Sequence, residues 1–254
     1  DADDTPGALL ALLELYSGTK REEEALINGC RWLTGLQNAD GGFPTFCKGW
    51  GRLPFDKSCA DLTGHALLAL STTHSRLGSK IDQGTKIKMG KSISKAIRYL
   101  ETHQHADGSW IPLWFGNQLT DDQTNPVYGT ARVCTYLLDG LKSNVLQNYF
   151  PDRLLSMVKK AEHYLISMQN PDGSWGGKKG VPGTIEETAL AVAALTLNHH
   201  EACKKGLQWL SNQKSLHASP IGLYFALLWY DEIMYPLVCY TEALRRTKES
   251  WKGK

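Results

Sequence analysis

The sequence predicts an all-α protein built from repeated helical hairpins. Apolar residues return every three or four positions over several long stretches, as they do on the buried face of a helix. One short motif recurs at a spacing of 67 and then 65 residues, beginning at Gln37, Gln104 and Gln169. No stretch alternates apolar and polar residues, so strands are not expected. Hairpins that stack in series form a solenoid or, if the series closes, an αα barrel.

Nine helical segments follow from this periodicity. The first is expected to begin at Pro6, with Thr5 as its cap, and the last to break near Pro236. Three segments lead into a copy of the motif and three follow a copy after a loop. The predicted ranges are 6–16, 22–37, 61–75, 91–104, 127–141, 152–169, 184–198, 201–213 and 221–246. The stretches 78–90 and 176–183 are interpreted as linkers, and since the repeat continues across both, residues 1–254 are predicted to form a single domain.

The repeated motif combines a glutamine, an Asp-Gly or Gly-Gly pair and an aromatic residue. Glycine permits the positive φ with which a helix commonly stops. The glutamine amide can bond exposed backbone groups at a helix end, and the ring can stack on that amide. We therefore interpret the motif mainly as a structural clasp. A degraded fourth copy is suggested around Gln213, followed by Pro220 and Gly222.

Composition excludes several classes of protein. With 254 residues, 42% of them apolar, the chain can bury a substantial core, and a net charge of +2 gives no reason to expect a nucleic acid partner. The six cysteines form no C-x-x-C pair, which predicts reduced thiols and an intracellular protein. The longest apolar stretch, 220–230, is about half of the ~20 residues that a membrane-spanning helix needs, and no signal peptide is recognised.

Two polar clusters carry candidate chemistry. Asp1, Asp3 and Asp4 open a chain that has no initial methionine, so the sequence is expected to be a fragment. Asp61 and His65 are four residues apart and share one face of a predicted helix. A solvated acidic end, and a helix-start aspartate with an interior histidine, are the alternatives for these two clusters.

These features together resemble the triterpene cyclases. Asp-Ala-Asp-Asp-Thr at 1–5 looks like their D-x-D-D-T acid motif, and the repeat looks like their QW motif. Residues 61–65 resemble the Asp-x-Thr-x-His helix that faces the acid, and 222–244 resemble the closing aromatic helix. The sequence is thus similar to the carboxy-terminal part of a squalene-hopene cyclase, about half of the family's length.

The resemblance implies an αα barrel, possibly incomplete, that forms most of the catalytic barrel of a two-barrel protein. It implies an isomerase that protonates a terminal double bond of squalene, or a related linear isoprenoid, without metal or redox cofactor. Asp3 matches the proton donor, while Asp1 and Asp4 would orient and polarise it. Crowded carboxylates in a poorly solvated pocket cannot all ionise, so one keeps its proton. Asp61 belongs to the same site, and a protonated His65 bonded to Asp3 would make the remaining proton more acidic.

A carbocation needs electron-rich walls that do not trap it, and an aromatic face provides about 0.5–2 kcal/mol of cation–π attraction. Any single aromatic residue on an apolar face is more often core, but Phe46, Trp110 and Tyr230 best match the family's lining positions. The substrate-binding candidates are Phe46, Trp110, Trp114, Tyr128, Tyr224, Trp229 and Tyr230.

Departures from the family pattern leave other functions open. Phe43 replaces the tryptophan of the first repeat, Ser219 stands where an aromatic residue is expected, and 118–125 resemble an insertion. One alternative is a zinc-dependent prenyltransferase β-like subunit using Asp56 and Cys59, although the ligand spacing is wrong by one residue and a third ligand is not evident. The other is a non-catalytic helical-repeat binding module.

The expected partners are a linear isoprenoid such as squalene, an upstream domain of the same protein and a membrane surface. By resemblance, the protein is expected to lie on the cytoplasmic side of the membrane as a peripheral or monotopic protein. We expect the isolated chain to give no detectable cyclisation, because the relatives build their cavity with a second barrel.

Overall fold

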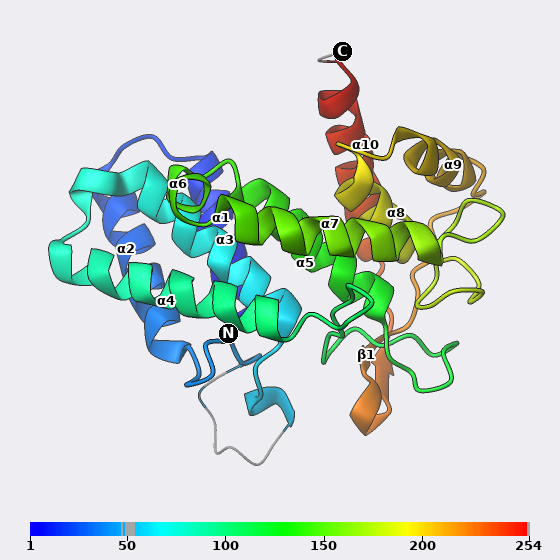
Figure 1. The fold of residues 1–254 in the computed structure, drawn as a ribbon, viewed down its shortest axis with the longest axis horizontal. Helices are drawn as coiled ribbons and strands as arrows, with labels where there is room; N and C mark the ends of the chain where they lie inside the picture. The colour runs from blue at the N-terminus through cyan, green and yellow to red at the C-terminus, as the bar shows by residue number, and fades with distance from the viewer. Residues whose placement is uncertain (47, 49–53, 253–254) are drawn as a thin grey trace. The chain divides into compact units, whose positions relative to one another are not determined.

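The computed structural model describes residues 1–46, 48 and 54–252 (Figure 1). The chain forms two compact units. The first consists of Asp1–Gln104 and Tyr136–Met157, and the second of His105–Thr135 and Val158–Lys254. The chain passes between the units three times: once after Gln104, once within α5 (Pro126–Gly140) and once within α7 (Pro151–Met168). Five of the six cysteines are free thiols, and Cys47 lies outside the described residues.

The first unit is a set of paired helices. Helix α1 (Asp4–Glu14) packs on α2 (Lys20–Leu36) and α3 (Ala60–Leu77), and α4 (Gln83–Thr102) also packs on α2 and α3 (Figure 1). Helix α2 begins with a capping box, in which Thr19 accepts from the Glu22 N–H and Glu22 accepts from the Thr19 N–H. The whole elements of the first unit are α1 (Asp4–Glu14), α2 (Lys20–Leu36), η1 (Pro54–Asp56), α3 (Ala60–Leu77), η2 (Gly78–Lys80), α4 (Gln83–Thr102) and α6 (Asn144–Tyr149).

The second unit is centred on α8 (Ile185–Leu195), which is buried along its whole length and packs on both α9 (His200–Ser211) and α10 (Tyr235–Lys252). The threonine before it, Thr184, caps its first turn by accepting from the Glu187 N–H. The other elements of this unit are α9 (His200–Ser211), β1 (Ile221–Leu223), η3 (Tyr224–Ala226), β2 (Leu228–Tyr230) and α10 (Tyr235–Lys252).

The helical repeat predicted from the motif is present. Gly41, Gly108 and Gly173 have φ of 96°, 94° and 94°, and each lies in a turn five or six residues after the last residue of the preceding helix. A Cβ at Gly108 would lie 2.3 Å from the Lys160 carbonyl oxygen, and the corresponding distances at Gly41 and Gly173 are 2.6 and 2.7 Å. Glycine is therefore required at this position both for its backbone conformation and for the close approach of the neighbouring helix.

The motif glutamines bond backbone carbonyls, as expected. Nε2 of Gln37 donates to the carbonyls of Gly41 and Ser92, at 2.8 and 2.9 Å. Gln169 repeats this pattern, and Gln104 donates to the Met157 carbonyl. Each glutamine amide thus forms hydrogen bonds with its own turn, with a later helix (α4, α7 or α9), or with both.

A buried threonine completes each copy of the motif. In all three copies the amide N–H of the motif aromatic donates to a threonine hydroxyl at the start of the next helix, at 2.9–3.0 Å. The pairs are Phe43 with Thr63, Trp110 with Thr130, and Trp175 with Thr188. The three aromatic side chains are fully buried.

The prediction of one helix over 221–246 was wrong for its first half. Residues 221–230 form an antiparallel hairpin in which Gly222 pairs with Trp229, and only the part from Tyr235 onward is helical. A Cβ at Gly222, where φ is 143°, would lie 1.9 Å from the Leu228 carbonyl oxygen, so the backbones approach too closely for any other residue. Pro236 does not break a helix but sits in its first turn, where its missing N–H costs nothing.

Other boundaries also differ from the prediction. The stretch 78–90 is not a linker throughout, because α4 begins at Gln83, where Asp82 caps it by accepting from the Thr85 N–H. Helix α1 begins at Asp4 rather than Pro6, so Thr5 is not its cap. The short helix α6 was not predicted.

Candidate active site

The acidic loop at the start of α1 is organised by Asp1. Its Oδ1 accepts from the N–H groups of Asp3, at 2.9 Å, and Asp4, at 2.7 Å. These bonds satisfy backbone donors that the start of a helix leaves without partners. Asp3 is the N-cap residue but makes no side-chain cap bond, so its carboxyl group is not used to hold the helix start.

The Asp3 carboxyl group instead meets His65 on α3. Its Oδ1 lies 3.1 Å from the histidine Nδ1, and the His65 side chain is only 12% exposed. The imidazole stacks on the ring of Tyr136, with centroids 4.8 Å apart and planes 4° apart. On α1, a Cβ at Gly7 would lie 3.6 Å from the histidine Cε1. Helices α1, α3 and α5 therefore fix the orientation of the imidazole that contacts Asp3.

Asp61 lies one helical turn before His65 and is buried. Burial raises the pKa of its carboxyl group, and the negative charge of Asp3 raises it further, while a hydrogen bond from the Cys59 thiol opposes both effects. The carboxyl group therefore holds its proton to higher pH than an exposed aspartate does.

The solvation of the cluster differs from the expectation. The Asp3 side chain is 45% exposed and Asp4 is exposed. Asp1 directs its carboxylate at backbone N–H groups. Among Asp1, Asp3, Asp4 and Asp61, only Asp61 is buried. Phe46 follows Thr45, whose carbonyl accepts from the Ala2 N–H at 2.9 Å, so this segment is tied to the acidic loop.

Most of the other predicted substrate-binding residues belong to the second unit, where three of them gather about residues 115 and 116. Tyr128 stacks on Phe115 with centroids 4.3 Å apart. A Cβ at Gly116 would lie 2.7 Å from Tyr224 Cβ and 2.8 Å from Trp229 Cη2. Phe115 was not predicted, although it lies one residue from Trp114.

The remaining aromatic candidates differ in exposure. Trp110 is fully buried, as are Phe43 and Trp175 at the same position of the other repeats. Packing of the repeat therefore explains why an aromatic residue stands here. Trp114 is half-buried. Tyr230 lies on β2 and is 44% exposed, and Phe46 is 43% exposed.

Glu187 is a buried acid that was not predicted from the sequence. Its Oε1 accepts from the side-chain amides of Asn117, at 3.0 Å, and Asn125, at 2.7 Å. Its Oε2 is buried with no hydrogen-bond partner among the described residues. Burial raises its pKa to about 7, and repulsion from Glu186 adds to this, although both amide bonds oppose the shift. The signal in the sequence was a pair of acids in the first turn of an otherwise apolar helix.

The described residues contain no group of three His, Cys, Asp or Glu side chains able to hold a metal ion. Within the same part of the chain, no helix has the length and apolar character needed to cross a membrane.

Comparison with known proteins identifies the family to which these helical hairpins belong. The model of the squalene-hopene cyclase C-terminal domain matches residues 1–220. The chain belongs to this family, and its fold class is the all-α toroid that was predicted.

Curated relatives include a probable squalene–hopene cyclase of Sinorhizobium fredii, 28% identical over 243 residues. A squalene–hopene cyclase of Bradyrhizobium diazoefficiens is 27% identical over 240 residues. Each match covers 85% of this chain but only 33% of the relative, so the chain spans about a third of their length.

Solved structures share the fold at low sequence identity. A type II terpene cyclase from Scytonema, in complex with geranylgeranyl dihydroxybenzoate, has a TM-score of 0.50 at 14% identity, with 97% of this chain and 86% of that chain covered. An unsaturated glucuronyl hydrolase specific for heparin has a TM-score of 0.65 at 15% identity, covering 93% of this chain and 71% of that chain. At such identities the likeness concerns the fold alone.

Proposed function

We propose that this chain supplies the acid that starts the polycyclisation of squalene or a related linear isoprenoid, as in hopanoid biosynthesis. The observation that carries the proposal is the Asp3–His65 pair, with Oδ1 and Nδ1 3.1 Å apart, in a chain of the squalene-hopene cyclase family. An aspartate with an ordinary pKa near 3.9 is mostly ionised at neutral pH, so a site that protonates an alkene must keep a proton on its acid until the substrate is bound.

In the proposed step, protonated Asp3 gives its proton to the terminal double bond. The π electrons form the new C–H bond, and the other alkene carbon becomes a tertiary cation. A protonated His65 donates its Nδ1–H to Asp3 Oδ1 and stabilises the carboxylate that remains. Tyr136 holds the imidazole plane, and Asp1 holds the backbone of the acidic loop.

Asp61 and Asp4 complete the acid site in this proposal. Because Asp61 is buried and its pKa is raised, it can remain neutral beside His65 and does not compete with Asp3 for the imidazolium charge. Asp4 lies in the first turn of α1 and contributes negative charge near Asp3.

The aromatic candidates would stabilise the cation. Tyr128, Tyr224 and Trp229, with Phe115 beside them, form an aromatic cluster suited to cation–π contacts. Phe46, Trp114 and Tyr230 remain proposed lining residues on the strength of the family resemblance, whereas Trp110 is accounted for by packing.

We also propose that an upstream domain of the same protein is needed, because the chain spans a third of its relatives. Incubated alone with squalene, the 254-residue chain should give no cyclised product. In its full-length form the protein is proposed to work without a metal or redox cofactor, bound peripherally to the cytoplasmic side of a membrane from which it takes its substrate.

The test is the Asp3→Asn variant of the full-length protein, assayed with squalene by gas chromatography and mass spectrometry. The amide cannot donate an acidic proton, so product formation should fall by at least about 10²-fold, the scale of general acid catalysis. Asp152→Asn, an exposed aspartate on α7, is the matched control and should retain wild-type activity. Equal activity of Asp3→Asn and wild type would reject the proposal.

A further inference from the structure

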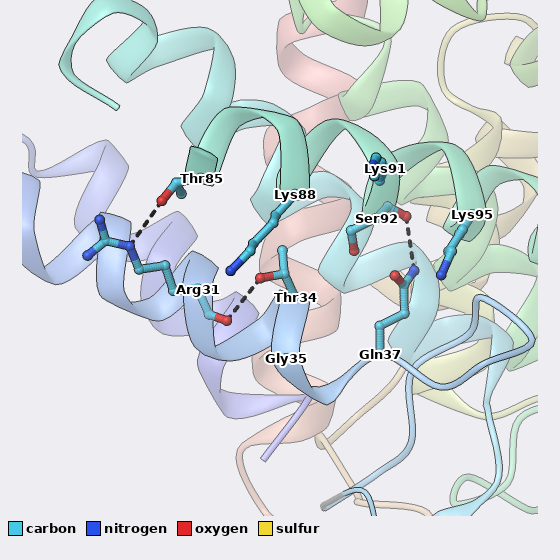
Figure 2. Close-up of a pocket in the computed structure, with 9 residues that line it drawn as sticks. All are labelled: Arg31, Thr34, Gly35, Gln37, Thr85, Lys88, Lys91, Ser92 and Lys95. Carbon is cyan, nitrogen blue, oxygen red and sulfur yellow. Dashed lines mark hydrogen bonds between the residues drawn. The ribbon is translucent and has the colours of Figure 1, made fainter. Parts of the chain in front are cut away.

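A cleft with a volume of about 400 Å³ lies between helices α2 and α4 of the first unit (Figure 2). Helix α2 contributes Arg31, Thr34 and Gly35, and helix α4 contributes three lysines and two hydroxyl-bearing residues. None of the proposed acid or aromatic residues lines this cleft, so the proposed function gives it no role.

The charge in the cleft is strongly one-sided. Lys88, Lys91 and Lys95 are exposed and follow one another along one face of α4. None of them takes part in an ion pair within the described part of the chain. Arg31, at one end, is paired with Asp82 at 2.8 Å. No carboxylate lines the cleft, so the three lysines repel one another unless an anion lies between them.

A buried hydroxyl group in the cleft points to the same kind of ligand. Ser92 is 3% exposed, yet its Oγ has no hydrogen-bond partner among the described residues. Figure 2 shows this hydroxyl directed toward α2, while the Ser92 carbonyl accepts from Gln37. A buried hydroxyl without a partner is costly, and an anion oxygen in the cleft would accept a hydrogen bond from it.

The cleft is open at Gly35, an exposed residue of its lining. A Cβ at Gly35 would meet no atom within 4 Å, so the missing side chain leaves space. Since a water molecule occupies about 30 Å³ of the liquid, the cleft has room for roughly a dozen waters, and hence for a group much larger than a simple ion.

We infer that the cleft between α2 and α4 binds a phosphate or diphosphate group through Lys88, Lys91, Lys95 and the hydroxyl of Ser92. Lysines act as point charges toward phosphate oxygens, and a serine hydroxyl donates to them. Such a group is carried both by soluble phosphate esters and by anionic phospholipid headgroups. This site goes beyond the proposed cyclase function and does not depend on it.

The experiment measures two probes on the 254-residue chain. Inorganic pyrophosphate binding is followed by isothermal titration calorimetry, and co-sedimentation is measured with phosphatidylglycerol vesicles against phosphatidylcholine vesicles. Combined Lys88→Gln, Lys91→Gln and Lys95→Gln should weaken binding at least about tenfold. Gly35→Leu fills the cleft without changing charge and should weaken it comparably. Combined Lys159→Gln, Lys160→Gln and Lys205→Gln, which alter exposed lysines of the second unit, form the charge-matched control.

Binding of pyrophosphate assigns the site to soluble ligands, and binding of anionic vesicles alone assigns it to headgroups. Either kind of binding supports the inference if the cleft variants lose that binding and the control variant binds within about twofold of wild type. Ser92→Ala should weaken binding by a smaller factor, with an unchanged circular dichroism spectrum. The inference is overturned if the unaltered chain binds neither probe, or if the control loses binding as much as the cleft variants do.

Discussion

Glu187→Gln should change how the stability of this chain depends on pH. Burial raises the pKa of Glu187 to about 7 from the 4.5 of an unperturbed glutamate. An acid whose folded-state pKa is raised binds more protons when folded than when unfolded between these two values. The folded state therefore loses stability as pH rises from 4.5 to 7, and the loss amounts to about 3 kcal/mol above pH 7.

The glutamine variant cannot ionise, and its amide oxygen can still accept from Asn117 and Asn125. It should thus be close to wild type in stability at pH 4.5 and more stable by up to about 3 kcal/mol at pH 8. Urea unfolding of both proteins between pH 4.5 and 8, followed by circular dichroism, measures this difference. Glu24→Gln, at an exposed position on α2, should show a small difference at every pH. If the gap between Glu187→Gln and wild type stays constant with pH, the reasoning about burial is wrong.

Three further predictions concern the repeat, the hairpin and the acid site. Thr188→Val removes the hydroxyl that accepts the Trp175 N–H and should cost about 1–3 kcal/mol of unfolding free energy, whereas a cost near zero would show that the bond is dispensable. Gly222→Ala should lower the melting temperature and speed amide exchange in β1 and β2, because its Cβ would lie 1.9 Å from a carbonyl oxygen of the partner strand; unchanged exchange contradicts this. In the full-length protein, Tyr136→Leu removes the ring stacked on His65 and should lower kcat without raising KM, while a change in KM alone would point to substrate binding instead.

The parts of the fold that could be predicted depend on residues that are close together in the sequence. The positive φ of Gly41, Gly108 and Gly173 follows from the motif alone, because each glycine comes after an aspartate in a turn that follows a helix with a clear apolar period. The pairing of Asp3 with His65 could also be expected, but only through the family motif, since 62 residues separate them.

The parts that could not be predicted depend on contacts between distant segments. The threonines that bind the motif aromatics lie 13 to 20 residues further along, and nothing in the motif specifies them. Residues 221–230 are apolar enough for a helix, but Gly222 pairs with Trp229 and also forms a bridge with Phe115. Such tertiary pairing overrides local propensity.

The solvation of the acid site also could not be predicted from the sequence. Three adjacent carboxylates suggested a shared desolvated pocket, yet Asp4 is exposed and Asp1 binds backbone amides. Two of the buried carboxyl groups, those of Asp61 and Glu187, are in the first turns of helices whose apolar residues bury them along with the helix. Burial of an acid is thus set by the packing of its helix rather than by its neighbours in sequence.

In the proposed mechanism, a proton carried by Asp3 starts the reaction. The most direct measurement is to incubate the full-length protein with squalene in deuterated water and to analyse the product by mass spectrometry. We expect one carbon-bound deuterium, placed on the CH carbon of the terminal double bond that received the proton, and loss of both product and label in Asp3→Asn. A cyclised product without carbon-bound deuterium, or a labelled product formed by Asp3→Asn at the wild-type rate, would contradict it.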